Sequence, residues 1–340
     1  MKYIDLFAGI GGFRMALDGL GLTCVLSSEI DRACQDVYEL NFGERPAGDI
    51  YAIDSESIPS FDILVGGFPC QPFSYAGKKL GFNDKKDGQL FFEILRILRD
   101  KKPKMFLLEN VKGIRSIEKG RTVDNILTSL RDLGYTVYDE VLDSNQFGLP
   151  QYRERWFCAG FDKNIHFQFP NGDDSSVKLK SIINEQDDNP ALLLSDREVE
   201  LIKFHFSSSE IRVKHENTLN ARPGSKIDKY GVYSYLKPDN TLRFHVGDPS
   251  KSQIQDFYYA SLDSVAPAII VTREPKLWDI KRKLSLLECQ RLQGFPDNFK
   301  FNVSDRKGKQ QLGNAVSVPV VREVVRYMLD YYDEAIPALQ

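Results

Sequence analysis

One cysteine of this sequence stands in a setting that suits a nucleophile. Cys70 lies in GGFPCQP, residues 66–72, where prolines on both sides stiffen the backbone around the thiol. It follows an apolar run at a Gly-rich turn, the kind of strand end where open α/β sheets bind ligands. Covalent catalysis there requires positive surroundings that raise the thiolate fraction. The ordinary interpretation, a small buried hydrophobe, is kept for the other cysteines, Cys24, Cys34, Cys158 and Cys289.

A carboxyl group and two guanidinium groups follow further along the chain. Glu109 ends an apolar run, and a carboxyl at the edge of a buried pocket can stay protonated and act as an acid. A helix N-cap is the alternative. In QYRERW, residues 151–156, alternation places Arg153 and Arg155 on one face of an entering strand. Paired guanidiniums suit phosphate or carbonyl recognition, and a solvated salt-bridge face is the alternative.

A glycine-rich loop suits a ligand with an adenosine moiety. FAGIGG, residues 7–12, follows a strand and precedes a helix, so backbone N–H groups can approach a ligand closely. Its glycines lack the spacing of a dinucleotide motif. Glu29 ends the second strand, where a carboxylate can bind ribose hydroxyls. Asp49 is expected to end a third short strand and to bind an adenine amine. Taken one at a time, the glycine loop can be a structural turn, and Glu29 and Asp49 can be solvated acids. Together they indicate a ligand with an adenosine moiety.

The elements that must position these residues alternate between strands and helices. Apolar runs and helical spacing predict the following strands: Tyr3–Phe7, Thr23–Ser28, Asp62–Gly66, Met105–Leu108, Thr136–Leu142 and Arg155–Gly160. The predicted helices are Phe13–Leu20, Arg32–Asn41, Leu90–Arg99 and Val123–Leu133. Strands separated by helices predict a mostly parallel sheet with helices on both faces.

The character of the chain changes after about Pro170. Residues 171–280 carry turn signals and short strand-like runs such as Ala268–Thr272, with Arg197–Phe206 as the best helix candidate. They predict a second, irregular β-rich domain, and residues 312–335 then return to a helix with an apolar stripe. From Lys203 to Lys283 we count 14 Lys and Arg against 9 Asp and Glu. This excess indicates either a solvated surface or a face that meets phosphates.

Composition sets outer limits on the class of protein. With 340 residues, 42% of them hydrophobic and 27% charged, the chain is expected to fold into one large or two unequal domains. A net charge of −3 excludes a globally basic nucleic-acid binder but not a local basic face. No apolar run reaches the roughly 18–20 residues of a membrane span. Five cysteines without a Cys-x-x-Cys pair suggest neither disulfides nor a metal site, and a reduced cytoplasmic setting is the default.

With these elements in this order, the chain resembles the DNA (cytosine-5)-methyltransferase family over nearly its whole length. The matching segments are residues 7–12 (the S-adenosylmethionine loop), 69–71 (PCQ, the nucleophile motif), 109–111 (ENV), 151–155 (Q-x-R-x-R), 288–296 (ECQRLQGFP) and 313–316 (GNAV). Six motifs in order, with a variable segment between the fourth and fifth, are a specific signal.

The resemblance implies a fold and a division of the chain. The fold is an α/β S-adenosylmethionine-dependent methyltransferase, a Rossmann-like sheet with helices on both faces plus a smaller β-rich target-recognition domain. Residues 1–180 and 308–340 would form the catalytic domain, closed by the C-terminal helix packing back on the N-terminal part. Residues 181–307 would form the small domain.

The resemblance also implies roles for single residues. Cys70 would attack C6 of a flipped-out cytosine, Glu109 would bind its N3/N4 edge, and Arg153 and Arg155 would support the pocket and the base. The implied cofactor residues are Phe7, Ala8, Gly9, Gly11, Gly12, Glu29, Asp49, Ile50, Pro69, Leu90, Asn314 and Val316. The candidate DNA contacts are Ser74, Lys78, Lys79, Gln151, Arg222, Arg243 and Arg273. The segment Gln71–Gln89 is predicted to close over DNA.

The expected reaction transfers a methyl group from S-adenosyl-L-methionine to C5 of cytosine in a specific double-stranded DNA sequence and leaves S-adenosyl-L-homocysteine. A monomer in the cytoplasm of a prokaryotic or phage-infected cell is expected. The resemblance implies a restriction–modification system with a restriction endonuclease that acts on the same site, and a solitary or regulatory methyltransferase is equally compatible with these residues. Three rivals remain. The first is a methyltransferase of transfer RNA, but the Cys-Phe-Thr tripeptide typical of that branch does not occur here. The second is a catalytically silent DNA-binding protein. The third is a NAD-dependent oxidoreductase, which would explain neither Cys70 nor Asn314.

Overall fold

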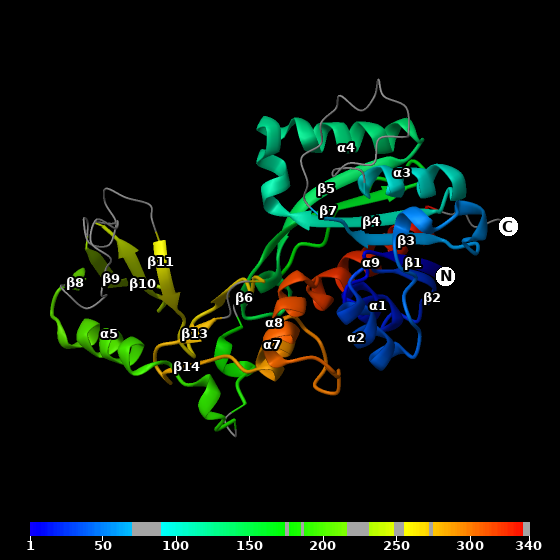
Figure 1. Ribbon diagram of the computed structural model, residues 1–340. Helices are drawn as coiled ribbons and strands as arrows, with labels where there is room; N and C mark the ends of the chain where they lie inside the picture. The colour runs from blue at the N-terminus through cyan, green and yellow to red at the C-terminus, as the bar shows by residue number, and fades with distance from the viewer. Residues whose placement is uncertain are drawn as a thin grey trace.

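A six-stranded sheet forms the centre of the larger part of the molecule (Figure 1), in the order β2-β1-β3-β4-β7-β5. The computed structural model describes residues 1–69, 90–173, 177–184, 187–215, 231–247, 255–271 and 275–335. The strands of this sheet are β1 (Lys2–Leu6), β2 (Thr23–Ser28), β3 (Ile63–Gly67), β4 (Met105–Val111), β5 (Thr136–Asp143) and β7 (Glu154–Phe161). The first four in spatial order are parallel, and β7 runs antiparallel to both β4 and β5. The predicted mostly parallel sheet is confirmed.

Helices cover both faces of this sheet, as predicted. The helices are α1 (Gly12–Asp18), α2 (Arg32–Phe42), α3 (Leu90–Lys101), α4 (Arg121–Asp132) and α9 (Val318–Glu334). Successive side chains of β4 point to opposite faces. Met105 and Leu107 therefore join a core cluster with α1, α2 and α9, whereas Phe106 and Leu108 join one with α3 and α4. Shorter 3₁₀ helices are η1 (Ile50–Ala52), η2 (Ser55–Ser57), η4 (Lys112–Gly120), η5 (Ser144–Phe147), η6 (Leu179–Ser181) and η7 (Pro190–Leu192).

The C-terminal region returns to the large sheet through α7 (Leu286–Leu292), α8 (Asp305–Asn314) and α9. The prediction of one helix over residues 312–335 is wrong, because α8 ends at Asn314 and Ala315 is extended. Pro319 lies in the first turn of α9, where a missing N–H costs nothing, so it marks a helix start. α9 packs against α1, and the expected return of the C-terminal helix to the N-terminal part is confirmed (Figure 1).

A second, antiparallel sheet forms the smaller part, in the order β11-β10-β9-β8. Its strands are β8 (Val213–His215), β9 (Val232–Leu236), β10 (Leu242–Val246) and β11 (Gln255–Tyr259). One face packs on α5 (Asp196–Ser207), where Leu201 and Ile202 meet Val232, Leu242 and Phe244. The predicted β-rich character of this region is confirmed, and so is its best helix candidate, Arg197–Phe206, which lies within α5.

Short strands connect the two parts. β6 (Gln151–Tyr152) pairs with β12 (Ala266–Pro267), and β13 (Lys276–Leu277) pairs with β14 (Arg282–Lys283). The strand predicted over Ala268–Thr272 is wrong, because pairing with β6 fixes the strand two residues earlier, and Thr272 lies outside the described residues.

Figure 1 shows the small sheet and α5 set apart from the large sheet. Cys289 and Leu292 of α7 nevertheless belong to the core cluster of the large part. The division at residues 181–307 stays a prediction. Within the described ranges, no helix is long and apolar enough to cross a membrane.

Candidate active site

A cavity of about 770 Å³ opens where β1, β2, β3 and β4 end. The segments that follow these strands line it, together with residues 313–316 from the end of α8. Ligands of open α/β sheets bind at the carboxyl ends of strands, and ligand cavities typically measure roughly 300–1,000 Å³. The cavity therefore has the size of a site for a small ligand, and Glu109 and Arg155 are among the residues that line it.

Eleven of the twelve predicted cofactor residues line this cavity. They are Phe7, Ala8, Gly9, Gly12, Glu29, Asp49, Ile50, Pro69, Leu90, Asn314 and Val316. Gly11 is the exception. It has a φ of +92°, and a Cβ there would overlap the ring of Phe42, so glycine is needed for the turn itself. Phe7 also has a positive φ, 58°, a strain that proteins retain mainly at functional sites.

Backbone donors hold the Glu29 side chain at the end of β2. Its Oε2 accepts from the Gly9 amide at 2.8 Å, and its Oε1 accepts from the Asp31 amide at 2.8 Å. Each oxygen keeps a second lone pair for a ligand hydroxyl. The third strand expected before Asp49 is absent from the described residues, which show only a single bridge between Ser28 and Ala47. Asp49 instead caps η1 by accepting from the Tyr51 amide at 3.0 Å.

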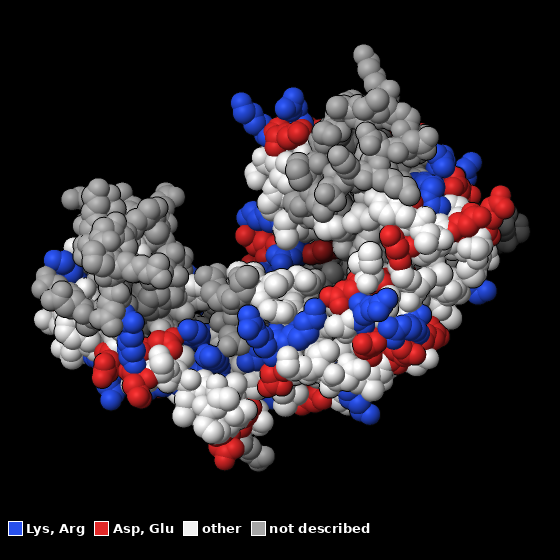
Figure 2. All heavy atoms as spheres, in the orientation of Figure 1, with Lys and Arg blue, Asp and Glu red and all other residues white. Residues whose placement is uncertain are grey.

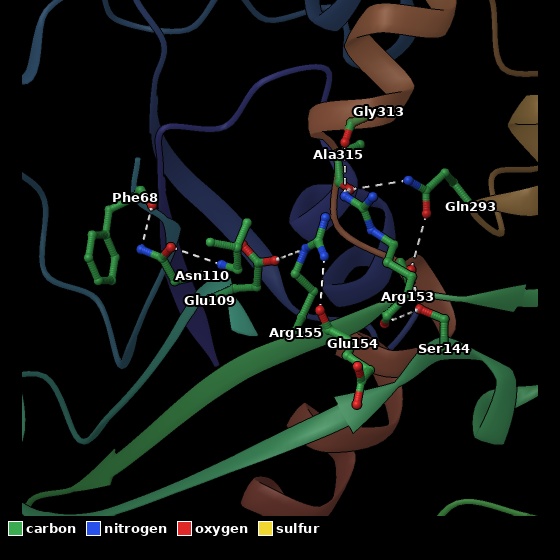
Figure 3. A network of polar contacts seen from close by, with 12 residues as sticks. Phe68, Glu109, Asn110, Ser144, Arg153, Glu154, Arg155, Gln293, Gly313 and Ala315 are labelled. Atoms are coloured by element: carbon green, nitrogen blue, oxygen red, sulfur yellow. Dashed lines mark hydrogen bonds and ion pairs between the residues drawn. The ribbon is translucent and has the colours of Figure 1, made fainter. Parts of the chain in front are cut away.

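Glu109 lies at the far end of the same cavity, buried in β4 beside β3 and β7 (Figure 3). Its Oε1 is 3.1 Å from Nε of Arg155. Burial raises the pKa of Glu109, and the charges of Arg155 and Arg153 oppose this rise. The group is thus a carboxyl that can hold a proton at higher pH than an exposed glutamate while one oxygen is oriented by Arg155.

Arg153 and Arg155 both line the cavity but do different things (Figure 3). Arg153 lies between β6 and β7, only 2% exposed. Its guanidinium donates to the carbonyls of Ile269 at 3.0 Å, Gly313 at 3.0 Å and Ala315 at 2.7 Å. It therefore fixes the backbone on both sides of Asn314, and burial lowers its pKa. Arg155 alone pairs with Glu109.

Asn110 has a role that the sequence did not predict, because its side chain joins the end of β4 to the end of β3. Its Nδ2 donates to the Phe68 carbonyl at 2.9 Å, and its Oδ1 accepts from the Val111 amide (Figure 3). Phe68 is two residues before Cys70 in the sequence, so this bond fixes the described backbone that leads to the cysteine. Cys70 lies outside the described residues, as do Ser74, Lys78, Lys79 and the rest of the predicted closing loop, Gln71–Gln89.

Several further lining residues were also missed: Ile30, Asp31, Cys34, Tyr51, Phe68 and Gln311. Ile30 offered a signal, because an apolar side chain directly after Glu29 at a strand end suits a flat aromatic base; it is 71% exposed. Gln311 offered none, because nothing local marks a buried glutamine on a polar helix.

The predicted DNA contact at Gln151 is wrong. The side chain is fully buried, its Nε2 donates to the Leu292 carbonyl at 2.9 Å, and its Oε1 accepts from the Ile269 amide at 2.9 Å. A buried amide with both ends bonded positions these segments and cannot reach DNA. Arg243 lies on the face of β10 that points away from α5, stacked over the Tyr258 ring at 4.6 Å. Arg222 and Arg273 lie outside the described residues.

The surface between the two parts is hollowed (Figure 2). Lys and Arg side chains gather along the lower border of this hollow in that view, although the whole chain carries a net charge of −3. Asp and Glu side chains lie among them in the same view, so the local basic face stays a prediction.

Comparison with known proteins identifies the family. The family model of C-5 cytosine-specific DNA methylases matches residues 1–330. The chain is 39% identical to the Type II methyltransferase M.DsaV of Dactylococcopsis salina, over 98% of this chain and 87% of the relative. It is 35% identical to M.HhaI of Haemophilus parahaemolyticus, over 95% of this chain and 93% of the relative.

Solved structures support the fold. The Dnmt2 methyltransferase of S. pombe matches with a TM-score of 0.66 and 16% identity, over 97% of this chain and 98% of that one. A DNMT2 variant of Spodoptera frugiperda matches with a TM-score of 0.67 and 19% identity, over 96% and 99%. The chain thus belongs to the C-5 cytosine-specific DNA methylase family and is a DNA cytosine-5 methyltransferase that uses S-adenosylmethionine.

Proposed function

We propose that Cys70, Glu109 and Arg155 carry out the methylation of C5 in a flipped-out cytosine of a specific duplex sequence. The observation that carries this assignment is the position of Glu109. It is buried, paired with Arg155, and shares one cavity with the loops that follow β1 and β2. Cys70 is assigned from the Pro-Cys-Gln motif and from its place just after Phe68, whose carbonyl Asn110 holds.

The cofactor is assigned to the end of the cavity formed by β1, β2 and α8. The backbone of the glycine loop 7–12 would approach the cofactor, and Glu29 would bind the ribose hydroxyls of the cofactor. Asp49 and Ile50 would lie beside its adenine ring. Asn314 and Val316 close the cavity from the C-terminal side. S-adenosylmethionine, when bound, supplies the methyl group, and S-adenosylhomocysteine remains.

Two groups of the chain make cytosine reactive. C5 of cytosine is a weak nucleophile, and addition of the Cys70 thiolate to C6 pushes electron density onto C5. A proton donated by Glu109 to N3 lowers the cost of this addition. After methyl transfer, a base such as water takes the C5 proton, the electron pair of that C–H bond restores C5=C6 and expels the Cys70 thiolate, and N3 returns its proton to Glu109. Arg155 keeps one Glu109 oxygen oriented, so the other is free for the base.

The DNA is assigned to the hollow between the two parts (Figure 2). C6 is hidden in duplex DNA, so the target base must leave the stack at a cost of a few kcal/mol. The small sheet would contribute sequence recognition, with Arg243 as its described candidate. Thr241-Leu242 at the start of β10 is one of two Thr-Leu pairs that resemble the family's recognition pair, and the other, Thr218-Leu219, lies outside the described residues.

The relatives support a proposal for the biological setting. Type II methyltransferases such as M.DsaV and M.NgoBI support a restriction–modification role in the cytoplasm of a bacterium or of a phage-infected cell. An endonuclease that cuts the same sequence would act separately on DNA and would need no stable complex with this chain. We propose a monomer with two domains divided near residues 181–307.

The first test is methylation of unmethylated genomic DNA with tritiated S-adenosylmethionine, followed by bisulfite sequencing. Label at C5 of cytosine in one recurrent short sequence is expected, and a Cys70→Ala variant should lose it. Cys24→Ala is the matched control, because Cys24 is buried in β2 and does not line the cavity.

The covalent bond is tested next on a duplex that carries 5-fluorocytosine at the identified position. Fluorine cannot leave C5 as a proton does, so a denaturation-resistant complex should form with the wild type and not with Cys70→Ala. Label in RNA alone, or label that persists in Cys70→Ala, would contradict the proposal.

A further inference from the structure

Gln311 is a buried polar residue of α8 that the mechanism above does not use. It is 4% exposed and lines the cofactor end of the cavity, one turn before Asn314. Its Nε2 donates to the Ala33 carbonyl at 3.0 Å and lies 3.7 Å from the Cys34 sulfur. Its Oε1 has no partner among the described residues. The side chain therefore joins α8 to a segment 278 residues away in the sequence.

The other end of this contact is the first turn of α2. Asp31 caps that turn by accepting from the Ala33 amide at 2.8 Å and the Cys34 amide at 3.4 Å. The Asp31 amide in turn donates to Glu29 Oε1. The position of the Glu29 carboxylate thus depends on where α2 begins, and Gln311 holds that start from the opposite wall.

A second tie from α8 reaches the same corner. Lys307 Nζ is 3.0 Å from Asp31 Oδ2, and this pair lowers the pKa of Asp31 against the opposing effect of burial. The two side chains are 38% and 43% exposed, so water and salt screen the pair. Gln311 is buried, and the loss of its bond would leave the Ala33 carbonyl without this donor. Of the two ties, Gln311 carries more of the constraint.

We propose that Gln311 is a positioning residue for the cofactor, which fixes the Glu29–Asp31 corner through the start of α2. This inference rests on the cofactor site proposed above. It implies that α8 contributes to the cofactor site in two ways. Asn314 forms part of the cavity wall, and Gln311 positions Glu29 through its contact with α2. Positioning the ribose contact affects cofactor affinity and leaves the chemical step on a saturated enzyme nearly unchanged.

The test compares Gln311→Met with Gln310→Met in the full-length protein. Methionine keeps the length of the side chain and removes the donor, and Gln310 is the preceding residue of α8 outside the cavity lining. The dissociation constant for S-adenosylhomocysteine, measured by calorimetry, should rise about tenfold in Gln311→Met, as expected for one lost buried hydrogen bond. kcat at saturating cofactor should stay within about twofold, and Gln310→Met should match the wild type in both.

A pH series with Gln311→Glu separates positioning from simple stabilisation. An ionised glutamate faces the Ala33 carbonyl without a donor, whereas the protonated acid can donate to it. The loss of affinity should therefore shrink as pH falls. If Gln311→Met does not fold, Lys307→Met tests the same corner from the surface, with an expected two- to threefold weakening, roughly, that disappears at high salt.

Two outcomes would overturn the inference. If Gln311→Met folds and its affinity for S-adenosylhomocysteine is unchanged, the positioning role is contradicted and the cofactor site is left intact. A wild type that binds no S-adenosylhomocysteine would instead overturn the cofactor site itself.

Discussion

Glu109 combines burial with a single ion pair, which makes its protonation state testable. Its pKa is raised by burial, so the protonated form persists to higher pH than in an exposed glutamate. If that form donates to N3, the single-turnover rate should fall as pH rises through the raised pKa. Glu109→Gln removes the transferable proton, and we expect a rate lower by about 10²–10⁴ that no longer falls over this pH range.

The matched control for this prediction is Glu154→Gln. Glu154 is one residue from Arg155 but exposed, and it pairs with Lys112 at 2.6 Å. It should leave the rate and its pH profile unchanged. A Glu109→Gln enzyme with the wild-type rate, while S-adenosylhomocysteine binds normally, would remove Glu109 from the mechanism.

Substitution of Arg153 is expected to lower stability, whereas substitution of Arg155 is expected to slow catalysis. Arg153→Met removes the donor that three backbone carbonyls share, and charged hydrogen bonds of this kind contribute roughly 1.5–3 kcal/mol each in favourable cases. We expect the free energy of unfolding to fall by at least about 2 kcal/mol. Arg155→Met should change stability much less and slow methylation instead.

Urea unfolding of the two variants, with the methylation rate of each, measures both effects. Equal losses of stability in Arg153→Met and Arg155→Met would show that the two arginines do the same work, against the contacts described here.

Residue types and motif order predicted most of the cavity wall, because the ends of parallel strands meet at one edge of a sheet. They did not predict what Gln151 and Arg153 do. The partners of Gln151, the Leu292 carbonyl and the Ile269 amide, are 141 and 118 residues away in the sequence. Only the folded chain shows that this amide is satisfied internally, and a polar residue beside two arginines otherwise looks like a DNA contact.

At the scale of elements, periodicity succeeded where a strand or helix is bounded by turns. The predicted strand Thr23–Ser28 matches β2 at both ends. It failed around residues 312–335, where apolar spacing continues across the break between α8 and α9. Pro319 accounts for the break, because proline is tolerated in the first turn of a helix and disrupts a helix interior. The apolar pattern alone could not show where α8 ends and α9 begins.

The contact between α5 and the small sheet contains a pH-dependent element. His205 of α5 and His215 of β8 share the Ser234 hydroxyl of β9, at 2.8 and 2.6 Å. Burial lowers the pKa of both rings, that of His215 to about 4, with His205 adding to the effect on His215. Both folded-state pKa values lie below the unfolded value of about 6.5. The unfolded chain therefore takes up protons first, and stability is lost as pH falls below about 6.5.

We expect the free energy of unfolding to decrease between about pH 7.5 and pH 5, by up to roughly 1.4 kcal/mol per pH unit for each histidine that stays neutral. Urea unfolding at several pH values measures this, and a His215→Gln variant should flatten the curve. His166→Gln, at an exposed position, serves as the control. Parallel curves for the wild type and His215→Gln would contradict the assignment.

At the scale of the whole molecule, a chain of net charge −3 must bind a polyanion through local charge. Affinity for duplex DNA should fall linearly with salt on a log–log plot, with a slope of about −0.9 per phosphate contacted. If Arg243 contacts a phosphate, Arg243→Met should reduce that slope by about one. Arg326→Met is the control, because Glu323 and Asp330 already neutralise Arg326 on α9. An unchanged slope in Arg243→Met would exclude the phosphate contact.

The cavity wall is assembled from distant parts of the chain, residues 7–13 on one side and residues 311–316 on the other. During synthesis these two segments are made about 300 residues apart, which takes roughly 15–60 s at 5–20 residues per second. A nascent chain that has not yet made α8 lacks Asn314, Val316 and the contact that holds the start of α2. If these residues bind the cofactor as proposed, cofactor binding, and with it DNA methylation, waits until this wall has been translated.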